Sequence, residues 1–403
     1  MCKLLQWIDK RFPLVTTWKK YASEYYVPKN LNTYYVFGVL ALVIIANQLL
    51  TGIWLTMFYT PTVTEAFDSI EYIMRDVNWG WLFRYMHSTG ASALFLVIYL
   101  HMFRGIVYGS YQKPRELVWL IGVGLFILLL AEAFFGYLLP WGQMSYWGAE
   151  VITSMLGSIP WVGDTLVTWL RGDYSVGNPT LQRFFALHVI AVPLLLIFLI
   201  FLHVVALHQV GSNNPDGIDI KNNLDDFGRP LDGIPFHPYY TVKDFFSVAI
   251  FLWVFFAVVL YVPDMGGYFL EQNNFVQADQ LITPEHIVPV WYMAPFYSIL
   301  RTVPHKLSGI FLMGMAVIIV IFLPWIDRSP VRSIRYKGFF SRYAIWLFGL
   351  SYLGLGLLGG LPLTNFTKIL TRIFTMSYFL FFLLMPVYSR YERTRLPPTR
   401  IRT

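Results

Sequence analysis

Four histidines recur at a helical spacing on two apolar stretches of the chain. His87 and His101 are fourteen residues apart, and His188 and His203 are fifteen apart. An α-helix rises about 1.5 Å per residue with 3.6 residues per turn, so each pair spans roughly 21 to 22 Å and returns to nearly the same helix face. In a hydrocarbon layer about 30 Å thick, one imidazole of each pair lies near each side. Two such helices face to face predict two bis-histidine sites stacked across a membrane, which suits two haems that carry electrons across it.

The competing interpretation is that these histidines are ordinary hydrogen-bonded core residues. Ionisable groups inside a membrane are costly and usually functional, and four at matched depths favour ligands. The one cysteine, Cys2, excludes a disulfide framework, a Cys-x-x-Cys-His haem attachment and a cysteine-ligated iron–sulfur cluster in this chain. We therefore expect two non-covalent haems, and an iron–sulfur partner would have to be another polypeptide.

The elements that carry the histidines are predicted membrane spans. Of the 403 residues, 56% are hydrophobic and 13% are charged, which is too apolar for a soluble protein of this size. We predict an all-α polytopic membrane protein with eight transmembrane helices, of which the first four form a dihaem bundle. The spans are residues 34–58, 81–108, 117–139, 184–207, 245–262, 307–325, 343–361 and 369–387.

The distribution of positive charge predicts the orientation. Most of the 30 Lys and Arg residues lie in the N-terminal segment, in alternate loops and in the C-terminal tail. By the positive-inside rule both termini face the cytoplasm, and an even number of helices agrees with this. The same asymmetry explains the net charge of +7 without a nucleic-acid partner.

Two glycine pairs repeat the histidine spacing on the first and third spans. Gly38 and Gly52 are fourteen residues apart, as are Gly122 and Gly136. Glycine lets a flat macrocycle approach a helix backbone, although small residues also serve close helix–helix packing in membranes. The shared spacing favours contact with the haems.

Arginines flank the histidines of the second span. Arg84 precedes His87 by three residues and Arg104 follows His101 by three, so each lies on a neighbouring position of the helix surface. We expect both to pair with haem propionates, and Arg183 less strongly so. The alternative is that they are interfacial arginines whose head groups extend to water.

Several motifs together resemble cytochrome b, the central subunit of ubiquinol–cytochrome c reductase, over nearly the whole chain. Beyond the histidine and glycine pairs, they are Pro-Trp-Gly-Gln-Met-Ser at 140–145, Gly-Ser-Asn-Asn-Pro at 211–215, Phe-His-Pro-Tyr-Tyr at 236–240, Lys243-Asp244 and Trp291-Tyr292. The resemblance implies a dihaem domain over residues 1–215 and a four-helix domain with quinol sites over 216–403.

The resemblance also implies a mechanism. Quinol is oxidised near the outer face, and one electron passes to a Rieske iron–sulfur protein and a membrane-anchored c-type cytochrome. The other crosses from an outer, low-potential b haem, held by His87 and His188, to an inner, high-potential b haem, held by His101 and His203. It then reduces quinone near the inner face. Because the electron moves inward against the membrane potential, quinol oxidation outside and quinone reduction inside convert redox energy into a proton gradient. The family further implies a homodimeric complex, in contact with membrane lipids.

The inner quinone site is predicted from residues beyond the last histidine ligand. His208 lies five residues after His203, while Ser212, Lys243 and Asp244 lie in the loop that closes the same side. A quinone carbonyl that becomes a hydroxyl needs a proton donor, for which histidine and aspartate are suited. With the resemblance, we expect His208 and Asp244 to donate protons and the other two to support them.

The outer site is expected between residues 140–150 and the loop 283–304. Phe135, Gly136, Tyr137 and Gly148 would line it together with Trp291 and Tyr292, since aromatic walls suit a flat apolar ligand. Tyr292 is a catalytic candidate.

This chain departs from the family at the outer site. Most relatives have Pro-Glu-Trp-Tyr, in which the glutamate receives a quinol proton, whereas this chain has Val290 between Pro289 and Trp291. Because valine cannot accept a proton, we expect another acceptor or water. Our first candidate is Glu285, followed by Glu150 and Glu132. The alternative for Glu285 is a solvated loop carboxylate.

A second departure is the fifteen-residue spacing of His188 and His203, where mitochondrial relatives have fourteen. Pro193 is expected to kink the helix and absorb the extra residue. Plastoquinol-oxidising relatives share the longer spacing, but their cytochrome b is split into two chains. One uninterrupted chain, no transit peptide and Val290 favour a respiratory protein of a bacterial inner membrane.

Three other functions remain open on the sequence. A dihaem conduit with one quinone site could serve a dehydrogenase, although such conduits usually have four or five spans. A transporter with incidental histidines is the second, and a purely structural membrane scaffold is the third. A reduced-minus-oxidised absorption spectrum separates the last two from a cytochrome.

Overall fold

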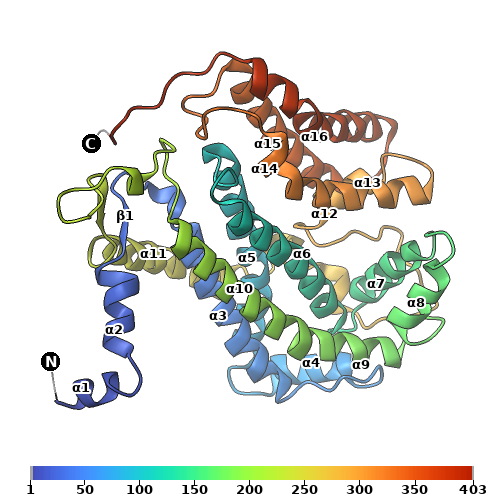
Figure 1. The fold of residues 1–403 in the computed structure, drawn as a ribbon. Helices are drawn as coiled ribbons and strands as arrows, with labels where there is room; N and C mark the ends of the chain where they lie inside the picture. Colours follow the sequence, from blue (N-terminus) through green and yellow to red (C-terminus); the bar gives the residue numbers. More distant parts are fainter. Residues whose placement is uncertain (1–2, 402–403) are drawn as a thin grey trace.

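The computed structural model describes residues 3–401 and is almost entirely helical (Figure 1). Cys2 lies outside the described residues. The long helices are α3 (Phe37–Thr56), α5 (Gly80–Tyr108), α6 (Glu116–Leu138), α10 (Val192–Val210), α11 (Tyr239–Tyr261), α13 (Lys306–Ile318), α15 (Phe339–Gly359) and α16 (Asn365–Tyr391). Within the described part of the chain, strands are confined to one short antiparallel pair, β1 (Tyr26–Pro28) and β2 (Gly233–Pro235). The predicted helical membrane fold is confirmed.

Seven helical segments of the described chain are long and apolar enough to cross a membrane. They are Thr33–Thr56, Gly80–Tyr108, Glu116–Leu138, Asn178–Val210, Tyr239–Tyr261, Lys306–Ile326 and Asn365–Tyr391. The eighth expected span coincides with α15, a helix of 21 residues. Its glycines, its tyrosines and Arg342 lower its mean hydropathy. It nevertheless packs along α16, where Phe348 stacks on Phe381 with ring centroids 4.5 Å apart.

The fourth span contains a π-helical turn that includes its first histidine, His188. α9 (Asn178–Ala186) leads into the turn Leu187–Ala191, and α10 follows. The N–H of Val192 bonds to the carbonyl of Leu187, five residues back. Pro193 has no N–H to bond four residues back, which favours the wider turn. A π turn accommodates one extra residue. The fifteen-residue histidine spacing is therefore absorbed by this turn, and not by the expected kink at Pro193 itself.

Segments from three parts of the chain meet at one end of the molecule. β1 pairs with β2 so that Val27 lies opposite Ile234. The carboxylate of Asp232 is buried between Lys29 Nζ, at 3.4 Å, and Arg400 Nε, at 2.8 Å. The N-terminal segment, the chain after α10 and the C-terminal tail are thereby joined. Both termini lie on the left of Figure 1, away from α7 (Gln143–Leu156) and α8 (Gly163–Arg171).

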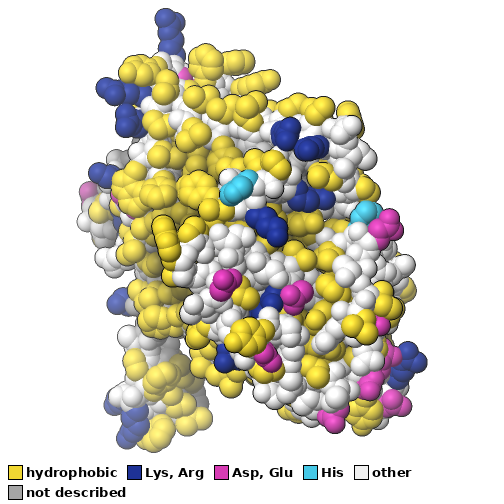
Figure 2. Space-filling view, turned by 90° about the vertical axis from the view of Figure 1, so that its right-hand side faces the viewer, with side chains coloured by type: hydrophobic (Ala, Val, Ile, Leu, Met, Phe, Trp, Pro, Cys, Tyr) yellow, Lys and Arg dark blue, Asp and Glu magenta, His cyan; other side chains and the backbone are white. Residues whose placement is uncertain are grey.

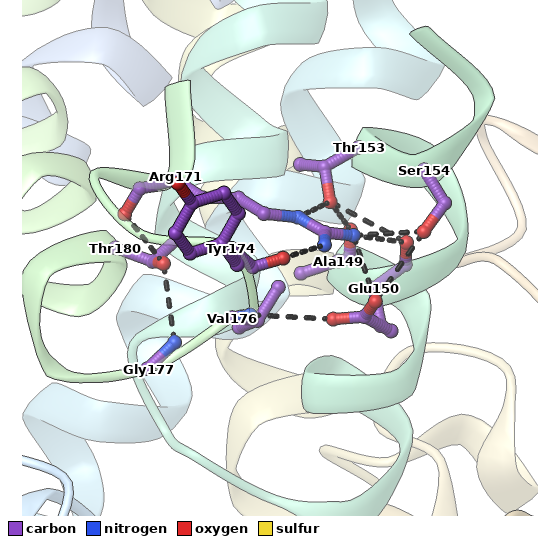
Figure 3. A network of polar contacts seen from close by, with 9 residues as sticks. All are labelled: Ala149, Glu150, Thr153, Ser154, Arg171, Tyr174, Val176, Gly177 and Thr180. Carbon is purple, nitrogen blue, oxygen red and sulfur yellow. Dashed lines mark hydrogen bonds and ion pairs between the residues drawn. The ribbon is translucent and has the colours of Figure 1, made fainter. Parts of the chain in front are cut away.

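The opposite end is organised around a buried arginine (Figure 3). Arg171, at the end of α8, forms an ion pair with Glu150 of α7 at 2.8 Å and donates to the Thr153 hydroxyl at 2.9 Å. The Thr180 hydroxyl of α9 donates to the Arg171 carbonyl at 2.8 Å. A buried charge is tolerated when it is paired and fully hydrogen-bonded. This network therefore holds α7, α8 and the start of α9 together.

The surface agrees with a membrane setting. Large apolar side chains are exposed along the outward faces of the long helices, including Phe198 and Phe201 on α10 and Trp253 on α11. Such faces suit contact with lipid. Figure 2, which looks at the α7–α8 side, shows charged side chains of both signs among hydrophobic ones.

Candidate functional site

The first histidine pair is spaced to hold one metal ion between its rings. His87 of α5 and His188 of the π turn face each other with ring centroids 6.1 Å apart and planes at 87°. Metal–nitrogen bonds of about 2 Å, with about 1 Å more from each nitrogen to its ring centre, would separate two imidazoles that bind one metal ion by about 6 Å. The observed separation therefore fits an iron with one histidine on each side.

Hydrogen bonds at Nδ1 orient both rings and leave Nε2 free to bind a metal ion. His87 Nδ1 lies 2.9 Å from the Thr51 hydroxyl, which itself donates to the Asn47 carbonyl and so accepts from the ring. His188 Nδ1 lies 3.0 Å from the carbonyl of Glu132 and 3.0 Å from its carboxylate. Metal-binding histidines typically donate their second N–H in this way. Nε2 of each ring is then left to bind a metal.

The second pair, His101 and His203, lies further along the chain on the same two membrane spans. His101 is on α5 beside α3, and His203 is on α10 beside α6. Arg104 Nη2 lies 3.3 Å from His101 Nδ1. Within residues 3–401 no three metal-binding side chains cluster together. A site with two histidines for each metal ion suits an iron that a macrocycle also holds.

Each of the four predicted glycines faces one of the four histidines. A Cβ placed on the glycine would lie 3.8 Å from Cε1 of the histidine ring for Gly38 and His101, 3.2 Å for Gly52 and His87, 3.1 Å for Gly122 and His203, and 2.4 Å for Gly136 and His188. Gly136 has the closest approach, because its missing side chain leaves room for the His188 ring. The matched spacing therefore places a residue without a side chain opposite each histidine ring.

One of the two flanking arginines, Arg104, has a buried N–H donor that an anionic ligand could accept from. The Nε atom of Arg104 is buried and lacks a hydrogen-bond partner within the described residues. Its guanidinium lies 4.6 Å from the Tyr35 ring centre. Between residues 3 and 401, no carboxylate forms an ion pair with Arg84 or Arg104. A buried guanidinium is stable when an anion pairs with it, as a propionate would. Arg183, in contrast, is exposed and donates to the Trp169 carbonyl.

The four residues predicted for the inner site line one cavity of about 650 Å³. His208 comes from the last turn of α10, and Gly211, with φ of 82°, turns the chain toward Ser212. Lys243 and Asp244 come from the second turn of α11. A cavity of this volume suits a small-molecule ligand. Histidine and aspartate reach it from different helices, as two proton donors for one quinone require.

Sequence reasoning missed a residue of this cavity, Tyr25. Its ring centroid lies 4.5 Å from that of His208, and both residues line the cavity. Burial raises the pKa of the Tyr25 phenol, while hydrogen bonding to Ser212 opposes that rise. Tyr25 reaches the cavity because β1 pairs with β2, which follows it by some two hundred residues. No local sequence signal indicates that pairing.

Only some of the residues predicted for the outer site lie close together. The Tyr137 hydroxyl, near the end of α6, donates to the carboxylate of Glu271 at 2.6 Å. A Cβ on Gly148 of α7 would lie 3.7 Å from the Tyr137 ring. Trp291 stacks on Phe269, two residues before Glu271, with ring centroids 6.3 Å apart. Tyr137 and Trp291 therefore both contact the segment 269–271, and Gly148 lies beside the Tyr137 ring.

Two other predicted outer residues lie against different helices. Tyr292 stacks on Phe95 of α5, with ring centroids 4.0 Å apart and planes at 5°. Phe135 packs against Phe184 of α9, with ring centroids 4.8 Å apart. Both side chains contribute to the apolar packing around the outer residues.

The three candidate proton acceptors occupy different settings. Glu150 is paired with Arg171, and Glu132 lies against the ring of His188. Glu285 is exposed in the loop before Val290, which is itself buried. Glu271, which sequence reasoning did not single out, is the carboxylate that contacts Tyr137. An acid in a long loop carries no signal until the docking of that loop is known.

Two family models match the chain. The model described as "Cytochrome b/b6/petB" matches residues 22–211, and "Cytochrome b(C-terminal)/b6/petD" matches residues 277–379. The first match contains all four paired histidines, and the second contains Trp291 and Tyr292.

Similar proteins extend this match to nearly the whole chain. A protein named cytochrome b from Allochromatium vinosum is 54% identical over 406 residues, covering 98% of each chain. Cytochrome b of Rhodospirillum rubrum is 48% identical, covering 99% of this chain and 96% of its own. A solved chain titled "Hyperthermophilic respiratory Complex III" superposes with a TM-score of 0.89 at 38% identity, covering 96% of this chain and 99% of its own.

Proposed function

The chain belongs to the cytochrome b family, and we propose that it works as the dihaem, quinol-oxidising subunit of a respiratory complex III. It oxidises ubiquinol near the outer face, passes one electron across the membrane and reduces quinone near the inner face. The observation that carries this function is the His87–His188 pair, whose rings are spaced for one metal. The inner cavity supplies the second requirement, a place for quinone on the other side.

The residues present fit two b haems. His87 and His188 would hold the outer one, and His101 and His203 the inner one. Bound haems supply one-electron redox centres at two depths, between which an electron can cross the bilayer. Thr51 and Glu132 fix the ligand rings of the outer pair, while Arg84 and Arg104 offer positive charge to the propionates.

The inner cavity binds quinone and delivers protons to it. His208 and Asp244 reach the cavity from α10 and α11 and protonate the two quinone oxygens as they are reduced. Lys243 and Ser212 position the quinone ring and the Asp244 carboxylate. The cavity lies at the end of the molecule where the N-terminal segment, β2 and the C-terminal tail meet, so protons are taken up on that side.

We further propose a membrane orientation, a division into two domains and a set of partners for this chain. The chain is a multi-pass protein of a bacterial inner membrane with both termini in the cytoplasm, in keeping with its basic termini and loops. We divide it into a dihaem domain over 1–215 and a quinol-site domain over 216–403, with α11 of the second lining the inner cavity. The partners are a Rieske iron–sulfur protein, a membrane-anchored c-type cytochrome and a second copy of the complex, within membrane lipid and without nucleic acid.

The test uses the purified complex with ubiquinol and an oxidised c-type cytochrome. We expect two b-haem signals per chain and electrons that divide between cytochrome c and the inner haem when quinone reduction is blocked. A complex that passed both electrons along one path would contradict the proposal and would indicate a dihaem conduit for another enzyme. A preparation without b-haem absorption would contradict both.

A further inference from the structure

The outer site lacks the carboxylate that its reaction requires at position 290, and the structure places another carboxylate nearby. Oxidation of quinol to quinone releases two protons, and Val290 can accept neither. We propose that Glu271, held by the Tyr137 hydroxyl, accepts one of the two protons. This inference rests on the proposed function and assigns the group that performs one of its steps.

The position of Glu271 is fixed by the docking of its loop. Residues that follow it bond to the start of α7: the Gln143 N–H donates to the Val276 carbonyl at 2.8 Å, and the Ser145 N–H donates to the Asn274 side chain at 2.9 Å. A little further on, the Ala278 N–H donates to the Trp141 carbonyl at 3.0 Å. The loop thus lies along the 140–145 motif rather than in solvent.

Aromatic residues of the outer site contact Glu271 and its loop. Tyr137 donates to it at 2.6 Å, and Phe269 of the same loop stacks on Trp291. Gly148 of α7 leaves space beside the Tyr137 ring. A hydrogen-bonded carboxylate among flat apolar rings is the arrangement expected of a proton acceptor for an aromatic alcohol.

The charge environment leaves Glu271 able to take up a proton. Within residues 3–401 no cation forms an ion pair with it. Burial raises the pKa of Glu271 to about 7, while the hydrogen bond from Tyr137 opposes part of that rise. Tyr137 and Tyr292 are the titratable groups that face it, and Glu150 of the neighbouring α7 is neutralised by Arg171. An acceptor works best when its pKa lies near the operating pH.

The other carboxylates are less suited to this step. Glu150 already pairs with Arg171, and Glu132 already accepts from the ring of His188. Glu285 is exposed, and no hydrogen bond or ion pair in the described structure joins it to Tyr137 or Trp291. Of these four acids, Glu271 is the one that is shielded, without a cation and hydrogen-bonded to an outer-site aromatic residue.

Oxidation of one ubiquinol to quinone releases two electrons and two protons. Ubiquinol loses two electrons to the two one-electron acceptors of the proposed function, the iron–sulfur partner and the outer b haem. One proton leaves with the partner. The second leaves when the O–H bond of the other quinol hydroxyl breaks and an O–H bond forms on the Glu271 carboxylate. Tyr137 remains protonated and orients the acceptor oxygen. Glu271 then releases the proton to the outer water and returns to its ionised form.

The test compares two single variants and a matched control in the assembled complex. E271Q keeps the size of the side chain and removes its basicity. Y137F keeps the ring and removes the donor. E65Q, an exposed glutamate ahead of α4 (Ala66–Arg75), is the control. For each, the rate of quinol oxidation is followed against pH together with the b-haem spectrum and the infrared absorption of protonated carboxyl groups.

We expect E271Q to lower quinol oxidation about 100-fold while both haem signals persist. The acidic limb of the pH profile near pH 7 and one titrating carboxyl band should disappear with it. Y137F should move that limb to higher pH, because the carboxylate loses a stabilising donor. E65Q should match the wild type.

Several results would overturn the inference. Wild-type rates in E271Q, or an unmoved acidic limb in Y137F, would remove Glu271 from the step. A loss in E285Q that E271Q does not share would assign the step to Glu285. If E271Q fails to assemble, Y137F still decides. A wild-type complex that fails to oxidise quinol would instead refute the proposed function, so the two failures are distinguishable.

Discussion

The substitution Gly136→Ala tests whether the close approach of Gly136 to the His188 ring is needed for the proposed outer haem site. The added Cβ would lie 2.4 Å from Cε1 of His188, 2.8 Å from Nδ1 and 2.9 Å from Nε2. Carbon atoms in ordinary contact are about 3.5 to 4.0 Å apart, so the ring has to move by at least about 1 Å. Metal–ligand distances tolerate only about 0.2 Å. The ring cannot make that movement and remain a ligand of the outer iron.

Alanine at the other three glycines is expected to disturb haem binding less, because the added Cβ lies further from the histidine ring. In Gly38→Ala the new Cβ lies 3.8 Å from the His101 ring, an ordinary contact, whereas Gly52→Ala and Gly122→Ala give 3.2 and 3.1 Å. Alanine favours a helix over glycine by about 1 kcal/mol, so none of the four should weaken the helix itself. A loss of haem would therefore report the ring contact and not a weaker helix.

The assay is a b-haem spectrum with a redox titration of each purified complex. Gly136→Ala should lose the outer haem signal and keep the inner one, and Gly38→Ala should keep both. Gly52→Ala and Gly122→Ala should keep both haems with a shifted potential for the haem beside the substitution. Equal losses in all four variants would refute the ranking by ring distance and would show that the glycines face the macrocycle instead. Unchanged haems in Gly136→Ala would refute the contact altogether.

Three further predictions concern other parts of the molecule. Thr51→Val removes the acceptor for His87 Nδ1–H, so the potential of the outer haem alone should rise, as a redox titration would show; a shift in both haems contradicts this. Asp244→Asn should slow quinone reduction at the inner site about 100-fold, measured as inner-haem oxidation by added quinone, and an unchanged rate removes Asp244 as a donor. Arg171→Leu leaves Glu150 without its buried partner and should cost about 3 kcal/mol of stability, seen as a lower Tm; an unchanged Tm contradicts a structural role for the network.

The features that the sequence predicts are those set by helix periodicity. The spacing of His87 and His101 and that of Gly122 and Gly136 follow from 3.6 residues per turn, so residues on one helix face could be placed without a structure. The residues of the inner cavity were predicted with the help of the family resemblance, since His208 follows His203 on one helix but Lys243 and Asp244 come from another. The structure adds that each glycine faces a specific histidine.

The features that the sequence does not predict depend on contacts between distant segments. Tyr25 reaches the inner cavity through the pairing of β1 with β2, and Glu271 reaches Tyr137 because its loop docks on α7. The extra residue after His188 enters a π turn, since Pro193 leaves a carbonyl without its usual donor. Short-range patterns carry no information on loop docking, and propensities distinguish α from π turns poorly.

The most direct test of the whole account is the number of haems that each chain binds. In the purified wild-type complex we predict two b haems per polypeptide, resolved as two components in a redox titration. In His101→Leu we predict one, with the outer component retained. One haem or none in the wild type, or two haems in His101→Leu, would contradict the claim that four histidines hold two irons at two depths.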